Sequence, residues 1–241
     1  MIAPVRRIHV KKLEIGEVRL DAAEAHHARD VLRLADRTPV ELFDDEGRQA
    51  PALLIHVGAS GAAVLVTELV EKQSAAEWTI AAAVPKGERA DWMVEKLSEL
   101  GASAFIPLAA ERSVVLPQGS NKMDRWKRIA IESAKQSRRA MPMRIEPLTT
   151  VDQLFANQMG ANQSNVGWYL STEPTATPVM QLLAPPPERL LALVGPEGGW
   201  TDGEILAFEK AGFLPVKLTA TILRVETAAI AIAALIGSSQ R

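Results

Sequence analysis

The stretch Leu190–Ile205, LLALVGPEGGWTDGEI, decides the fold class of this 241-residue chain. It opens on an unbroken apolar run, Leu190–Val194, of the kind found in parallel strands that are buried on both faces. After three glycines it continues as Thr201-Asp-Gly-Glu204, a capping box that predicts the start of a helix. A buried strand, a glycine-rich turn and a helix in this order indicate an α/β domain with a parallel sheet.

The alternation of strand and helix recurs on both sides of this stretch. The predicted strands are 79–85, 104–108, 166–171 and 214–218. The predicted helices are 86–100, 124–139 and 222–236, the first of them ending at Gly101. The segment 172–188 contains five prolines and is expected to be a loop.

The N-terminal part of the chain has a different pattern, with short β-like runs and tight bends. The predicted strands are 6–10, 17–20, 39–43, 52–57 and 62–70, and one helix over 22–34 interrupts them. Strands at this spacing are typical of a small barrel-like β domain. The polar stretch 71–77 is interpreted as a linker, so we expect a β domain over 1–72 and an α/β domain over 73–241.

The composition excludes several classes of protein. The chain has no cysteine, which rules out disulfides, Cys-ligated zinc, iron–sulfur clusters and thiolate nucleophiles. Its longest apolar run, Ala228–Ile236, is nine residues, well short of the roughly 20 that span a bilayer. The N-terminus lacks the pattern of a signal peptide. We therefore expect a cytoplasmic protein without a membrane helix.

The net charge of −2 hides a basic segment. Residues 122–144 contain eight basic and two acidic side chains, with Trp126 among them, which favours contact with an RNA backbone over a merely solvated face. Because His26 and His27 are adjacent and point apart, no metal site is expected there. The residues predicted to bind RNA are Arg6, Arg7, His26, His27, Arg33, Arg112, Arg125, Arg128, Arg138 and Arg139.

The glycine-rich loop Gly195–Gly199 follows the carboxyl end of a predicted strand, where α/β proteins bind ligands. A tight turn alone would explain one glycine, but three favour a ligand site. The chain contains neither a G-x-G loop nor the G-x-x-x-x-G-K-[ST] phosphate loop, so an ordinary nucleoside-phosphate cradle is not expected. The loop suits a ligand that is recognised mainly by backbone polar groups.

A second strand end, at Leu218–Thr227, carries Arg224 and Glu226, the two charged residues of 218–236. They form either a buried structural ion pair or part of a site, and the nearby glycine loop favours the site. A third strand ends near Leu170, so three strand ends are expected to converge.

Several motifs in order along nearly the whole chain resemble the RsmE family of ribosomal RNA methyltransferases. The motifs are HHARDVLRL (26–34), PKGERADWMVEKLSELG (85–101), RSV (112–114), RWKRIAIESAKQSRR (125–139), VGPEGGWTDGEI (194–205) and LTATILRVETAA (218–229). Two positions depart from the family pattern. Thr219 replaces a usual Gly, which would narrow the cofactor loop, and Thr221 replaces a usual Arg, which removes one cation.

The resemblance implies a SPOUT-class α/β domain with a C-terminal trefoil knot, preceded by a PUA-like β-barrel, in a homodimer. It also implies N3-methylation of one uridine in 16S rRNA or the small ribosomal subunit, with S-adenosyl-L-methionine as the methyl donor. The leucines among the implied cofactor residues are explained equally well as core. The implied cofactor-binding residues are Leu170, Thr172, Gly195, Gly198, Gly199, Leu218, Ile222 and Leu223.

The hypothesis for catalysis is that Glu226 accepts the imide proton of the base and that Arg224 orients it or stabilises developing negative charge. Glu197 is the reserve proton acceptor. Trp200 covers the cofactor or, as we favour, packs under the next helix. Two alternatives stay open: a SPOUT enzyme that methylates a ribose hydroxyl or another base nitrogen, and a non-catalytic RNA-binding factor in ribosome assembly.

Overall fold

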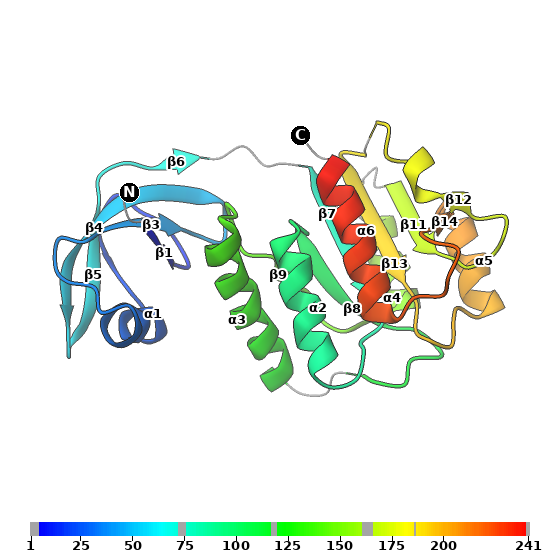
Figure 1. The fold of residues 1–241 in the computed structure, drawn as a ribbon, viewed down its shortest axis with the longest axis horizontal. Coiled ribbons are helices and arrows are strands. Elements are labelled where there is room, and N and C mark those ends of the chain that lie inside the picture. The colour runs from blue at the N-terminus through cyan, green and yellow to red at the C-terminus, as the bar shows by residue number, and fades with distance from the viewer. Residues whose placement is uncertain (1–4, 72–75, 117–119, 161–165, 186, 240–241) are drawn as a thin grey trace. The chain divides into compact units, whose positions relative to one another are not determined.

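The computed structural model describes residues 5–71, 76–116, 120–160, 166–185 and 187–239 (Figure 1). The chain folds into two compact units, 1–74 with 134–142 and 75–133 with 143–241. The predicted domain boundary and most of the predicted linker fall on 72–75, outside the described residues. The segment 134–142 packs in the first unit, although we predicted it within the α/β domain.

The first unit contains a six-stranded sheet with the order β1-β3-β4-β5-β2, and β6 pairs with β4. The pair β1–β3 is parallel, and the other pairs are antiparallel. The predicted strand 62–70 is divided between β5 and β6. The strands are β1 (Arg6–His9), β2 (Gly16–Arg19), β3 (Pro39–Phe43), β4 (Arg48–Gly58), β5 (Gly61–Val66) and β6 (Val70–Glu71).

The helical part of this unit is shorter than predicted. The α-helix α1 covers Ala22–His26, and a π-helical turn, η1 (His27–Val31), continues it. Asp21 caps α1 by accepting a hydrogen bond of 2.9 Å from the backbone N–H of Glu24. The core of the unit consists of alternate side chains of the sheet, including Ile8, Leu42, Leu54 and Val64.

The second unit is built on an eight-stranded sheet with the order β10-β8-β7-β13-β11-β14-β12, in which β9 also pairs with β8. All pairings between its described strands are parallel. The strands are β7 (Glu77–Ala82), β8 (Ala104–Ala109), β9 (Arg144–Ile145), β10 (Thr149–Thr150), β11 (Val166–Leu170), β12 (Thr177–Pro178), β13 (Arg189–Val194) and β14 (Leu214–Lys217). The helices are α2 (Glu88–Glu99), α3 (Ser120–Ser137), α4 (Val151–Gly160), η2 (Val179–Gln181), α5 (Asp202–Lys210) and α6 (Val225–Ser239), and the last turn of α3, from residue 134, belongs to the first unit.

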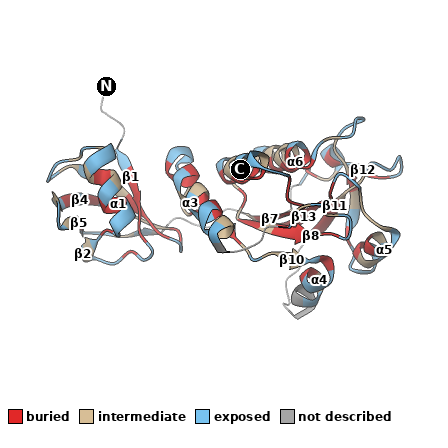
Figure 2. Cartoon of the chain, turned by 90° about the horizontal axis from the view of Figure 1, so that it is seen from below, coloured by how far each residue is buried: buried red, intermediate tan, exposed pale blue. Residues whose placement is uncertain are grey.

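Strand β13 lies inside the sheet between β7 and β11, and it is buried on both faces as predicted. Leu190, Ala192 and Val194 join the core cluster that contains residues of α2, α3 and α6. Leu191 and Leu193 join the cluster on the opposite face, with residues of α4 and α5. In Figure 2 the buried strands lie between α6 on one side and α4 and α5 on the other, which makes a three-layer α/β unit.

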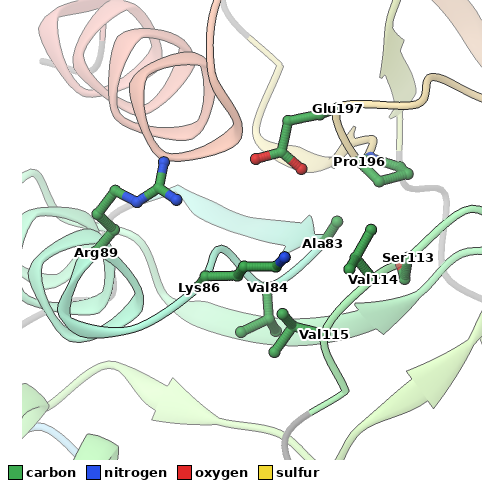
Figure 3. Close-up of a pocket in the computed structure, with 9 residues that line it drawn as sticks. All are labelled: Ala83, Val84, Lys86, Arg89, Ser113, Val114, Val115, Pro196 and Glu197. Carbon is green, nitrogen blue, oxygen red and sulfur yellow. The ribbon is translucent and has the colours of Figure 1, made fainter.

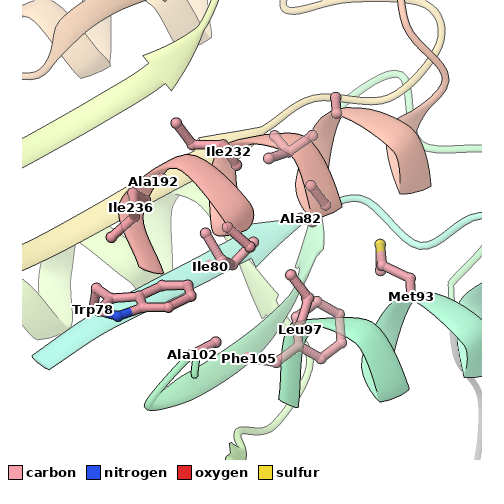
Figure 4. Close-up of a cluster of buried hydrophobic side chains, with 14 of the residues drawn as sticks. Trp78, Ile80, Ala82, Met93, Leu97, Ala102, Phe105, Ala192, Ile232 and Ile236 are labelled. Carbon is pink, nitrogen blue, oxygen red and sulfur yellow. The ribbon is translucent and has the colours of Figure 1, made fainter. Parts of the chain in front are cut away.

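The larger core cluster joins sheet and helices closely (Figure 4). Ile80 of β7 and Phe105 of β8 are fully buried against Leu97 of α2 and Ile232 of α6. Among the described residues, no helix combines the length and the apolar character that crossing a membrane requires. Likewise, the described part of the chain holds no group of three or more His, Cys, Asp or Glu side chains suited to a metal ion.

Several helix boundaries differ from the prediction in ways that concern the site. Helix α6 begins at Val225, so 222–224 belong to the preceding loop. Helix α4 and the short elements β12 and η2 were not predicted. Gly101 follows the end of α2 with φ +103°, as expected at a C-terminal cap. The capping box of α5 is confirmed: Thr201 accepts from the N–H of Glu204, and Glu204 accepts from the N–H of Thr201.

We predict that Thr201→Ala lowers the free energy of unfolding by about 1 kcal/mol, because one N–H of the first turn of α5 loses its partner. The thermal unfolding midpoint should fall by about 2–4 °C for a chain of this size. Thr201→Ser is the matched control, since it keeps the capping hydroxyl. Equal midpoints for the Ala and Ser variants would contradict this role of the cap.

Candidate functional site

A cavity of about 530 Å³ lies at the carboxyl ends of β11, β13 and β14. These strands are neighbours in the sheet, so the loops that leave them meet at one edge. The predicted convergence of three strand ends is confirmed, and we call this space the glycine-loop cavity. It is lined by all the residues expected to bind the cofactor: Leu170, Thr172, Gly195, Gly198, Gly199, Leu218, Ile222 and Leu223.

The side chain of Trp200 packs directly against the glycine loop. A Cβ atom on Gly195 would lie 2.8 Å from Cε2 of the Trp200 indole, so no side chain fits there. The indole packs against Phe208 of α5 with ring centroids 4.8 Å apart, and its Nε1 donates to the Leu170 carbonyl at 2.9 Å. Trp200 therefore packs under the next helix, as we favoured, and joins two loops of the cavity. Gly199 has φ +71°, a conformation that other residues rarely adopt.

The segment after β8 holds the glycine loop from the other side. Arg112 donates to the Gly198 carbonyl at 2.9 Å and to the Trp200 carbonyl at 3.2 Å. The backbone N–H of Glu111 donates to Glu204 at 2.9 Å, which ties the same segment to the start of α5. Arg112, which we predicted to bind RNA, thus has a defined structural role in shaping the cavity.

The third loop, 218–224, forms another wall of the glycine-loop cavity. Thr219 Oγ1 donates to the backbone carbonyl of Thr221 at 2.7 Å, so the Thr219 side chain stabilises the turn at these two positions. Ile222 is 84% exposed although it lines the cavity. Leu218 and Leu223 pack against the core as well as lining the cavity, so their place in the core is confirmed and their contact with a cofactor stays a prediction.

Glu226 and Arg224 do not form the expected pair. Glu226 is only 4% exposed, and its Oε1 accepts from Arg89 of α2 at 3.2 Å. Its Oε2 is buried without a hydrogen-bond partner among the described residues. Arg224 is exposed and lines the glycine-loop cavity, whereas Glu226 is not among the residues lining it. Of the two roles predicted for Arg224, orientation of Glu226 is not seen, because Arg89 pairs with Glu226 instead. Stabilisation of developing negative charge by Arg224 stays a prediction.

A second cavity of about 270 Å³ adjoins the first at the loop after β13. Pro196 and Glu197 line both cavities. Figure 3 shows Lys86, Arg89 and Glu197 with their charged ends directed toward this smaller space, above an apolar floor that includes Val84. We call it the Lys86 cavity.

Lys86 and Arg89 were missed at the sequence level, although a signal was present. Both follow the carboxyl end of a predicted strand, the same position that identified the other loops. The segment was interpreted as the start of a helix and as one of the family motifs, and neither residue was assigned to the site. That Lys86, Arg89 and Glu197 share one cavity follows from the pairing of β7 with β13, which joins residues far apart in the sequence.

The residues predicted to bind RNA differ in accessibility. Arg7 is buried, donates to Glu41 at 2.9 Å and to the Ala134 carbonyl at 3.0 Å, and so is not available to RNA. Trp126 is fully buried and bonded to Asp91, which corrects its assignment to an RNA-binding face. Exposed in their own units are Arg6, His26, Arg33, Arg112, Arg125, Arg128 and Arg138.

Several basic residues form ion pairs within the protein or are half-buried. Lys135 is buried and forms an ion pair with Glu24. Arg125 pairs with Asp91 at 2.7 Å but stays exposed. His27 and Arg139 are half-buried. Burial lowers the pKa of the Arg139 guanidinium to about 10, which leaves it positively charged at neutral pH.

Comparison with known families and sequences gives consistent results. Residues 72–237 match the model of an RNA methyltransferase domain. The chain is 30% identical to the ribosomal RNA small subunit methyltransferase E of Bacillus subtilis, over 92% of this chain and 91% of that protein. It is 33% identical to the protein of the same name from Synechocystis, over 88% of this chain and 69% of that protein.

Solved structures agree over nearly the whole chain. The ribosomal RNA small subunit methyltransferase E of Neisseria gonorrhoeae, bound to S-adenosyl methionine, superposes with a TM-score of 0.83, 26% identity and 97% coverage of both chains. A putative methyltransferase of Legionella pneumophila in complex with the cofactor SAM gives a TM-score of 0.85, 26% identity and 98% coverage of both chains.

Proposed function

Since the chain belongs to the RNA methyltransferase family that includes the ribosomal RNA small subunit methyltransferases E, we propose that it transfers a methyl group from S-adenosylmethionine to small-subunit ribosomal RNA. The observation that carries the proposal is the glycine-loop cavity, where three adjacent strand ends converge. Two solved structures that are similar to this chain over nearly its full length have that cofactor bound.

The residues of the glycine-loop cavity fit S-adenosylmethionine. Its volume of about 530 Å³ lies within the roughly 300–1,000 Å³ typical of small-molecule sites. Gly195, Gly198 and Gly199 line the cavity without side chains, so their backbone groups can approach an adenosine moiety closely. Leu218 and Leu223 offer apolar contact, and Arg224 and Glu173 supply opposite charges suited to the carboxylate and ammonium of an amino-acid group.

When bound, this cofactor supplies a methyl group on a sulfonium, a strong electrophile that needs no further activation. The protein must then align the acceptor and remove its proton. Because the chain has no cysteine, it cannot form the thiolate adduct that many carbon methylations of pyrimidines use. A nitrogen activated by loss of a proton is compatible with the carboxylates present, and we propose N3 of a uridine in 16S rRNA.

The basic residues that are exposed in their own units support RNA as the substrate. Arg128 and Arg138 are exposed, and Arg139 remains charged at neutral pH. Such groups bind the phosphate backbone and position an RNA without reading its sequence. The first unit, which we propose to be PUA-like, exposes Arg6, His26 and Arg33, which can bind RNA phosphates in the same way.

The family resemblance extends the proposal to the architecture of the second unit and to assembly. We include in it a SPOUT-class domain with a C-terminal trefoil knot, a homodimer and a cytoplasmic location. Several large apolar side chains of the second unit are exposed and are therefore available to a second copy of the chain. Among them are Val114, 73% exposed, Met180, 66% exposed, and Ile222, 84% exposed.

We predict that the chain binds S-adenosylmethionine and that Gly195→Ala weakens this binding at least about tenfold, or about 1.4 kcal/mol. The added methyl group would meet the Trp200 indole at 2.8 Å and displace the loop. Gly203→Ala is the matched control, because its Cβ would meet only Thr201 Oγ1 at 3.9 Å. Calorimetric titration of the wild type, Gly195→Ala and Gly203→Ala with S-adenosylmethionine measures these affinities. Absence of binding to the wild-type chain would favour the non-catalytic RNA-binding alternative.

Incubation of the chain with unmodified small subunits, or with their 16S rRNA, should yield 3-methyluridine after digestion to nucleosides. Mass analysis with reference nucleosides separates this product from ribose-methylated uridine and from other methylated bases. A ribose-methylated product would support the SPOUT alternative and contradict the proposed acceptor atom. No methylated nucleoside from either substrate would contradict the enzymatic function itself.

A further inference from the structure

The Lys86 cavity contains charged groups that the cofactor site leaves unexplained. Lys86, Arg89 and Glu197 line a space of about 270 Å³ whose other walls include the apolar side chains Val84 and Val115. This volume is below the roughly 300–1,000 Å³ of pockets that bury drug-sized ligands. Apolar walls with two cations and one carboxylate suit a single flat, polar ring that becomes negatively charged.

The position of the cavity adds a second argument. Pro196 and Glu197 form a wall shared with the glycine-loop cavity. A methyl acceptor must approach the donor carbon to within about 3–3.5 Å, so it has to occupy a space that adjoins the cofactor. The Lys86 cavity meets this requirement within the second unit.

We infer that the Lys86 cavity receives the target base of the RNA and that Glu197 accepts the proton that this base loses. The inference rests on the proposed function, since it assigns the acceptor half of the same site. In the step, the N3–H bond of the base breaks and its proton passes to the Glu197 carboxylate. The electron pair of N3 forms the bond to the methyl carbon, and the pair of the broken carbon–sulfur bond stays on sulfur as a neutral thioether.

Exposure distinguishes Glu197 from Glu226 as the proton acceptor. Glu197 is exposed and lines both cavities, so its carboxyl group can return the proton to water after each turnover. Glu226 is 4% exposed, lines neither of these cavities and is paired with Arg89 at 3.2 Å. The geometry therefore makes Glu226 a positioning residue that acts through Arg89.

Lys86 and Arg89 supply positive charge to the proposed acceptor site. As the imide proton leaves, negative charge spreads over N3 and the two carbonyl oxygens of a uracil ring. Fixed cations in a partly enclosed site stabilise such charge more than water does. The ion pair with Glu226 holds the Arg89 guanidinium in place before the base arrives.

The first test compares Glu197→Gln with Glu209→Gln, a control on the exposed face of α5. We expect Glu197→Gln to lower the single-turnover methylation rate about 10²–10⁴-fold, the usual contribution of a general base. The rate should also keep rising with pH where the wild-type rate has levelled off. Affinity for S-adenosylmethionine should not change. A Glu197→Gln rate within threefold of wild type, with an unaltered pH profile, would overturn the inference.

The second test measures binding without the cofactor. Lys86→Met should weaken binding of a short RNA that contains the target uridine at least about fivefold, whereas Lys210→Met, on α5, should not. Equal affinities of the two variants would contradict the acceptor cavity. If the wild-type chain binds S-adenosylmethionine and methylates rRNA, and Glu197→Gln methylates at the wild-type rate, this inference alone is refuted. A wild-type chain that does neither refutes the proposed function.

The third test addresses the positioning role of Glu226. If Glu226 acts only through Arg89, the variants Arg89→Gln and Glu226→Gln should each slow methylation, and the double variant should be no slower than Arg89→Gln. The shape of the pH profile should stay that of the wild type in all three. Additive losses would contradict the positioning role, and a pH profile altered by Glu226→Gln would instead make Glu226 the proton acceptor.

Discussion

The burial of β13 on both faces is the constraint on which the rest of the second unit depends. Its alternate side chains enter two separate core clusters, so helices have to cover both faces of the sheet. Full burial of each large apolar side chain contributes about 1.5–3 kcal/mol, which makes another register costly. Since the neighbouring strands are parallel, their following loops leave at the same edge, and the loop after β13 becomes a wall of both cavities.

Much of this arrangement could be predicted because it depends on local patterns. The apolar run Leu190–Val194 predicted a strand buried on both faces, and the capping box at Thr201 predicted the start of α5. The glycines and leucines expected at the cofactor all line one cavity, since strand order and direction fix where loops emerge. Motif resemblance added the expectation of a family, which the comparisons support.

What could not be predicted depends on contacts between distant segments. The type of a residue does not show which arginine is buried: Arg7 is internal because it lies over Phe43 and bonds to Ala134. Glu226 is only two residues from Arg224, yet its partner is Arg89, which α2 brings beside α6. The segment 134–142 continues α3 but packs in the first unit, and no change in composition marks that transition.

We propose that one loop, 195–200, separates a cofactor site from an acceptor site. A crystal structure of the protein with S-adenosylmethionine would test this arrangement. We expect the adenosine to lie against the backbone of this loop and the methyl-bearing sulfur to face Glu197 and the Lys86 cavity. A cofactor bound elsewhere, or bound in the glycine-loop cavity with its methyl group directed away from the Lys86 cavity, would contradict the arrangement.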